Sequence, residues 1–110
     1  AVRSDIASSS FDDSRGQATN YMIDLPEGAV GQISNNWFVQ GRNKENYSAF
    51  IAVAAEGESH PSVGLSIVSN DARLVPGLSR QTVFVADWSG DALAIGENTL
   101  GPGLTRFERR

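Results

Sequence analysis

The segment from residue 83 to 103, VFVADWSGDALAIGENTLGPG, gathers the residue types best suited to bind a ligand. Asp87 and Asp91 flank a Trp-Ser-Gly, and Asn98 follows in a second polar loop. Calcium accepts carboxylate and amide oxygens, and an aromatic ring such as Trp88 beside fixed polar groups is typical of sugar-binding sites. The segment therefore offers two kinds of site, one for a cation and one for a carbohydrate.

The same residues are also ordinary components of tight turns. Asp and Asn side chains bond local backbone groups in turns, and the spacing here matches no compact calcium loop. We therefore expect turns and no metal site. Asp87, Trp88, Asp91 and Asn98 remain a candidate ligand loop under the hypothesis that the chain binds a carbohydrate.

Catalytic patterns are sparse in this chain. It has one histidine and no cysteine, and His60 is adjacent in sequence to Ser59, a placement that rarely lets a nucleophile and its base face each other. No Gly-x-Ser-x-Gly elbow or phosphate-binding glycine loop is present. We expect no enzyme activity, no catalytic residues and no cofactor.

Charge and composition exclude further classes. The formal net charge is −4 and the nine Lys and Arg residues are scattered, which disfavours a nucleic-acid partner bound through its phosphates. The absence of cysteine excludes disulfides. No apolar run approaches the roughly 20 residues that span a bilayer, so we expect no membrane partner. The localisation stays unknown, with a soluble chain, in a virion or outside the cell, as the expectation.

Short apolar segments separated by Gly, Pro, Asn and Asp predict strands. Seven segments alternate or carry β-branched residues, at 21–25, 29–40, 47–56, 63–69, 81–87, 92–96 and 104–109. The imperfect alternation in 29–40 suggests a bulge near 34–36, and the four residues 88–91 suit a hairpin. Trp37, in the same segment as this bulge, is expected to be partly buried at the rim of the fold. No helical period and no internal repeat emerge.

These segments predict an all-β fold. We expect a single small β-sandwich or barrel of six to seven short antiparallel strands, with residues 20–110 as the β-domain. Residues 1–19 are rich in Ser, Asp and Arg and predict an extended N-terminal arm. Ile6 and Phe11 would anchor this arm, and the terminal Arg109 and Arg110 would reach carboxylates on a neighbouring subunit.

In outline, with no matching residues, this layout resembles the small decoration or cement proteins of tailed-phage capsids. The sequence thus favours a non-enzymatic structural subunit that assembles through its arm, as a symmetric oligomer with other copies of itself or on a larger protein lattice. The alternative is a lectin-like carbohydrate-binding β-sandwich module that uses the loop around Trp88.

Overall fold

The computed structural model describes residues 3–12, 21–25, 28–41, 49–57 and 60–110. These residues form strands and no helix, and among them there is no helix of the length and hydropathy needed to cross a membrane. The first six strands are β1 (Arg3–Ala7), β2 (Ser10–Asp12), β3 (Ile23–Leu25), β4 (Val30–Ser34), β5 (Trp37–Gln40) and β6 (Ala49–Val53). The next six are β7 (Ser66–Val68), β8 (Asp71–Leu74), β9 (Thr82–Asp87), β10 (Ala94–Ile95), β11 (Thr99–Leu100) and β12 (Leu104–Arg109).

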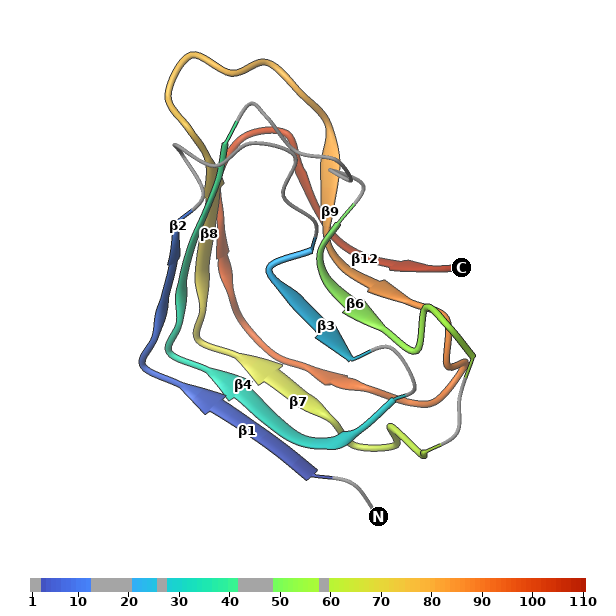
Figure 1. Cartoon of the computed structure of the whole chain (residues 1–110). Coiled ribbons are helices and arrows are strands. Elements are labelled where there is room, and N and C mark those ends of the chain that lie inside the picture. The colour runs from blue at the N-terminus through green and yellow to red at the C-terminus, as the bar shows by residue number, and fades with distance from the viewer. Residues whose placement is uncertain (1–2, 13–20, 26–27, 42–48, 58–59) are drawn as a thin grey trace.

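The strands form three parallel sheets, because each strand from β4 onward pairs with the strand that lies three places earlier in the chain. The sheet orders are β1-β4-β7-β10, β2-β5-β8-β11 and β3-β6-β9-β12, and all pairings are parallel. Each run of three consecutive strands is one coil, and the coils stack into a parallel β-solenoid. Figure 1 shows β1, β4 and β7 side by side on one wall, and β3, β6, β9 and β12 on another. We call β1–β3 the first coil and β10–β12 the last coil.

The prediction of an antiparallel β-sandwich or barrel is therefore wrong, although the all-β class is correct. Alternation and turn residues look alike in parallel and antiparallel strands, so they did not reveal strand direction. The expected bulge near 34–36 is a corner between β4 and β5, which lie in different sheets. The expected hairpin at 88–91 is also a corner, because β9 and β10 belong to different sheets. The likeness to capsid decoration proteins rested on the sandwich layout and falls with it.

The chain does contain a repeat, which variable corner lengths conceal. Only two residues separate the first and second strands in each of the first three coils, and three do so in the last coil. The corner between second and third strands instead has ten residues after β2, eight after β5, seven after β8 and three after β11. Because no fixed period results, the repeat is not visible in the sequence.

Equivalent positions of successive coils stack inside the solenoid. Ile6, Ile33, Ile67 and Ile95 follow one another in register across the first sheet, and Ile33 and Ile67 have no exposed surface. In the second sheet the ring of Phe11 stacks on Phe38 with centroids 5.1 Å apart. The Phe38 ring also meets the edges of Phe50 and Phe84 at 6.4 and 5.7 Å, so aromatic rings join the second and third sheets.

A ladder of asparagines holds the short corner of successive coils. Asn36, Asn70 and Asn98 occupy the same corner position in the second, third and last coils. Asn36 Oδ1 accepts a hydrogen bond from Ser9 N at 2.9 Å, and Asn36 Nδ2 donates to Ile6 O at 3.0 Å. Each asparagine thus bonds the backbone of the coil before it and satisfies polar groups that the corner would leave unpaired.

The residue before the ladder position is left-handed in the first three coils. Ser8, Asn35 and Ser69 have φ values of 53°, 55° and 59°. Asn tolerates this region better than most residues, and the strain is of the order of 1–2 kcal/mol for an L-residue. The sharp backbone turn at this residue allows two strands in different sheets to be joined by only two residues.

Residues 3–12, part of the segment expected to form an arm, lie in or between strands β1 and β2. β1 pairs along its whole length with β4, and β2 pairs with β5. The remainder of that segment at 1–2 and 13–19 lies outside the described residues. Ile6 and Phe11 therefore pack against the core of their own chain.

Candidate functional site

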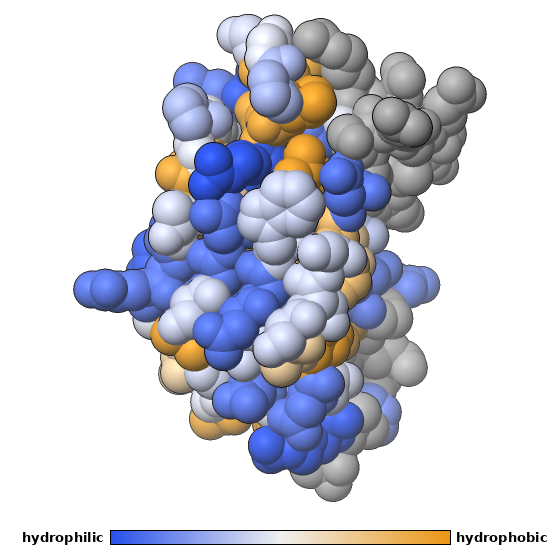
Figure 2. All heavy atoms as spheres, turned by 90° about the vertical axis from the view of Figure 1, so that its left-hand side faces the viewer, coloured by the Kyte–Doolittle hydropathy of each residue, from blue (hydrophilic) through white to orange (hydrophobic). Residues whose placement is uncertain are grey.

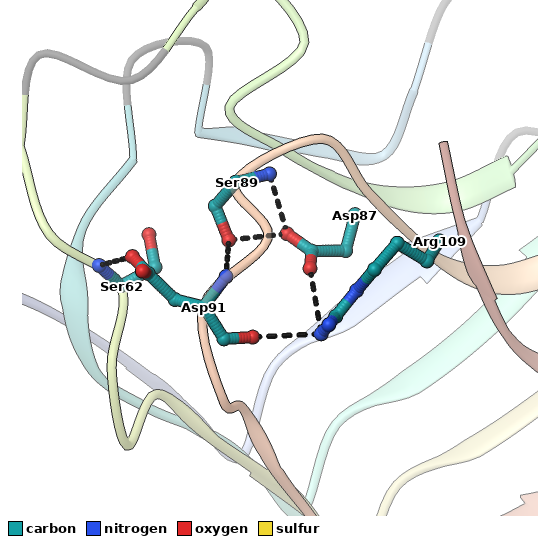
Figure 3. Close-up of polar contacts among 5 residues, drawn as sticks. All are labelled: Ser62, Asp87, Ser89, Asp91 and Arg109. Carbon is teal, nitrogen blue, oxygen red and sulfur yellow. Dashed lines mark hydrogen bonds and ion pairs between the residues drawn. The ribbon is translucent and has the colours of Figure 1, made fainter.

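The candidate ligand loop is a compact corner that follows β9 (Figure 3). Asp87 is fully buried, and its Oδ1 accepts hydrogen bonds from Ser89 N at 2.8 Å and from Ser89 Oγ at 2.6 Å. The same hydroxyl accepts a bond from Asp91 N at 3.0 Å. The Asp87 carboxylate is thus used to hold the backbone of the turn, as Asp commonly does.

Asp91 and Arg109 tie this corner to neighbouring coils. Asp91 Oδ2 accepts a hydrogen bond from Ser62 N at 2.9 Å, and Arg109 Nη2 donates to Asp91 O at 2.8 Å. The same guanidinium nitrogen lies 3.3 Å from Asp87 Oδ2. Figure 3 shows the Arg109 side chain extended toward both aspartates. Arg109, expected to reach a neighbouring subunit, therefore neutralises a buried carboxylate of its own chain.

Trp88 and Arg110 pack together beside this corner. The Arg110 guanidinium carbon lies 5.3 Å from the centre of the Trp88 ring, within the range of a cation–π contact. Tyr21 meets the same ring edge-on at 6.4 Å. Because Trp88 is also packed against the core, one face of its ring is engaged within the chain.

Asn98 lies at a different corner of the solenoid. Its Oδ1 accepts bonds from Asn70 N and Nδ2 at 3.0 and 2.9 Å, and its Nδ2 donates to Ile67 O at 3.2 Å. The structure therefore brings Asp87, Trp88 and Asp91 together but places Asn98 in the asparagine ladder. Among the residues the structure describes, no group of three or more His, Cys, Asp or Glu side chains could hold a metal ion.

Replacing Arg109 with methionine is expected to destabilise the fold by about 2 kcal/mol, because the buried Asp87 Oδ2 would lose the guanidinium that lies 3.3 Å from it. Arg3→Met is the matched control, since Arg3 pairs with Asp5 on the surface and should cost no more than about 0.5 kcal/mol. Urea unfolding measures both variants. If Asp87→Asn fails to reduce the cost of Arg109→Met, the buried charge is not its source.

The two ends of the solenoid form a second candidate site. Every strand of the first and last coils has a hydrogen-bonded neighbour on one side only, among the described residues. Apolar side chains that are only partly buried concentrate in and beside these coils, namely Ile6, Phe11, Met22, Leu25, Leu93, Ile95, Leu100, Leu104 and Phe107. In the two central coils the equivalent residues of the core are fully buried.

One carboxylate at the first coil is electrostatically unfavourable. Asp24 lies in β3, the last strand on one side of the third sheet. Partial burial raises the pKa of Asp24, and the negative charge of Glu56 raises it further. Ionised Asp24 therefore slightly opposes folding near neutral pH, and this opposition disappears as the pH falls through the raised pKa and the carboxyl is protonated.

Sequence patterns did not predict two prominent features of the structure. Asn36 was assigned to a bulge within a predicted strand and Asn70 to a connection, and the available signal was their recurrence after an apolar run, as in ISNNW, IVSND and IGENT. Trp37 was expected to be buried at a rim, but 43% of its surface is exposed. Trp37 and the buried Phe38 are adjacent in β5, so their side chains point to opposite faces of the sheet. This alternation was the sequence pattern that could have predicted the exposure of Trp37.

Comparison with known protein families, curated protein sequences and solved structures finds no match to this chain. The function must therefore be argued from the geometry of the solenoid itself.

Proposed function

We propose that the chain is a non-enzymatic structural module that assembles end to end, with the first coil of one copy stacked on the last coil of another. The observation that carries this proposal is the concentration of partly buried apolar side chains in and beside the first and last coils. Exposed edge strands are templates for strand addition, and end repeats of solenoids are expected to bury their apolar face or be capped. In this proposal the first and last coils mediate assembly, and not the N-terminal arm that was expected from the sequence.

The register supports head-to-tail stacking. If the next copy continued each sheet, its Ile6 would lie beside Ile95, because these two residues end the same column. By the same argument its Phe11 would lie beside Leu100. Ile23 of the next copy would lie beside Phe107. Apolar residues thus meet apolar residues in all three sheets, and the added strands would be parallel like those within the chain.

Two features make this junction weaker than the contact between coils of one chain. The first coil has Ser9 at the ladder position, and the Ser9 hydroxyl bonds Ala7 O in its own coil. No asparagine would therefore cross the junction. The register also places Asp24 of the next copy beside Glu108, where like charges repel. We therefore expect a reversible, concentration-dependent association.

A lysine placed inward at either end should block stacking. Phe11→Lys blocks the first coil and Leu100→Lys blocks the last, so light scattering should report a monomer for each variant alone. An equimolar mixture should form dimers and nothing larger, because each partner keeps one usable end. The unaltered chain should form a concentration-dependent series of larger species.

Outward-facing substitutions in the same strands are the matched controls. Ser10 and Thr99 are exposed neighbours of Phe11 and Leu100, so Ser10→Lys and Thr99→Lys should leave the association unchanged. Circular dichroism confirms that each variant is folded. A chain that stays monomeric at millimolar concentration, or an association that survives both inward lysines in the same molecule, would contradict the proposal.

A further inference from the structure

The outer face of the sheet β2-β5-β8-β11 carries a row of side chains unlike the rest of the surface. Strand alternation points Phe11, Phe38 and Ala72 inward, where they belong to or pack against the core, and leaves Ser10, Trp37, Asp71 and Thr99 on the outer face. These four are consecutive partners in register, one from each strand. Figure 2 faces this side of the molecule, and hydrophilic side chains cover most of it.

Trp37 is the one large hydrophobic side chain of the described residues that is exposed on this sheet. It has 43% of its surface exposed, and Val63 is the other large hydrophobic side chain that is exposed among the described residues. Val63 lies in the connection between β6 and β7, outside this sheet. A protein-binding surface usually presents a contiguous apolar patch. A single indole ring set among polar groups instead suits a ligand with alternating apolar and hydroxyl faces.

The polar groups next to Trp37 are held in place. Arg73 Nε donates to Asp71 Oδ1 at 2.8 Å, and Arg73 Nη2 donates to Asp71 Oδ2 at 2.7 Å. This two-bond pairing fixes both planar groups on the sheet surface. Each keeps hydrogen-bonding capacity toward solvent, since the side chains are 46% and 35% exposed for Arg73 and Asp71.

The row ends in an open hollow at the last coil. This hollow has a volume of about 870 Å³, and Asp71, Glu97, Asn98, Thr99 and Arg106 contribute to its lining. Asp71 and Thr99 belong both to the row and to the hollow. A ligand lying across the strands could therefore stack on Trp37 and continue past Asp71 into the hollow.

We propose that this face binds a neutral oligosaccharide, with one sugar ring stacked on Trp37 and the following units hydrogen-bonded by Asp71, Arg73 and the groups of the hollow. Aromatic stacking combined with fixed polar groups is the arrangement that sugars require. The charges of this face and of the whole chain favour a neutral oligosaccharide over a charged one. Asp71 and Arg73 neutralise each other, and the chain has a net charge of −4, so an anionic polymer would be repelled.

This proposal concerns a sheet face and does not depend on stacking of the coil ends. It also places the carbohydrate hypothesis at a different site from the loop around Trp88. The Trp88 ring is engaged by Tyr21 and Arg110, whereas Trp37 is exposed.

Titration calorimetry against four neutral hexasaccharides, built from glucose in β-1,4 linkage, glucose in α-1,4 linkage, mannose or xylose, tests the proposal. At least one should bind, with an affinity that changes little between low and high salt. Trp37→Ala should weaken that binding at least tenfold, and Trp37→Phe should restore part of it. Val63→Ala, which removes the other exposed apolar side chain, should leave the affinity unchanged.

Three outcomes would overturn the proposal. One is the absence of binding by all four hexasaccharides at millimolar concentration. Another is binding that survives Trp37→Ala, which would move the site elsewhere. The third is a preference for hexagalacturonate or a single-stranded DNA oligonucleotide over every neutral sugar, which would assign the face to an anionic ligand. Using the Phe11→Lys variant for all titrations separates sugar binding from end-to-end association.

Discussion

Replacing Asn70 with alanine is expected to lower the free energy of unfolding by about 3 to 5 kcal/mol, the sum of two or three buried groups left unpaired. Asn70 is 2% exposed. Its Oδ1 accepts from Asn36 N and Nδ2 at 3.0 and 3.1 Å, and its Nδ2 donates to Ile33 O and Asn98 Oδ1 at 3.0 and 2.9 Å. The alanine variant leaves Asn36 N, Asn36 Nδ2 and Ile33 O without these bonds in residues that are at most 3% exposed. Urea unfolding followed by circular dichroism measures the loss.

The end of the ladder provides the comparison. Asn98 is only partly buried and lies in the last coil. In the alanine variant, water can therefore hydrogen-bond some of the groups that lose the Asn98 side chain as a partner. We expect Asn98→Ala to cost about 1 to 2 kcal/mol. Equal losses for the two variants would show that position within the ladder does not matter. A negligible loss for Asn70→Ala would show that the hydrogen bonds of the ladder contribute little net stability.

The Gly31→Ala variant is expected to lose about 3 to 5 kcal/mol and to disrupt the pairing of the first coil. Gly31 has a φ of 120°, and a Cβ atom there would lie 2.0 Å from the carbonyl oxygen of Ser4. That oxygen belongs to the backbone of β1, so the clash cannot be relieved by a side-chain rotation. Strand β1 must move away from β4, and this cost adds to the left-handed strain of about 1–2 kcal/mol.

Gly64→Ala separates the two costs. Gly64 also has a positive φ, 78°, but no other atom lies within 4 Å of where its Cβ would be. It should therefore lose only the strain of about 1–2 kcal/mol. Hydrogen exchange of the β1 and β4 amides should increase in Gly31→Ala and not in Gly64→Ala. If both variants lose the same stability, the approach of Ser4 to Gly31 is not a close contact in solution.

The sequence predicted strand segments better than it predicted their arrangement. The apolar segments at 81–87 and 104–109 contain β9 and β12, because β-branched and aromatic residues favour strands whatever their partners. Strands β8 and β11 were assigned to loops, since each is short and begins with polar residues. The direction of pairing was not readable, because corners and hairpins use the same Gly, Asn and Asp residues.

The sequence predicted only the part of the candidate ligand loop that is formed by residues close together in the chain. Asp87, Trp88 and Asp91 are close in sequence, and one corner suffices to bring them together. Asn98 could be placed only by knowing that the chain turns through a full coil. Ser62 and Arg109, which complete the contacts of that corner, are distant in sequence and required the tertiary structure. Trp37, Asp71 and Thr99 become neighbours only through parallel register.

The unequal lengths of the solenoid corners determine where this chain can accept new sequence. At the short corner, the asparagine ladder couples each coil to the next, so an added residue would shift two strands at once. The corner after the second strand already varies from three to ten residues between coils. Surface insertions are tolerated when the connected elements stay in place. Peptides grafted into that longer corner should therefore be displayed without disturbing either the stacked core or the Trp37 face.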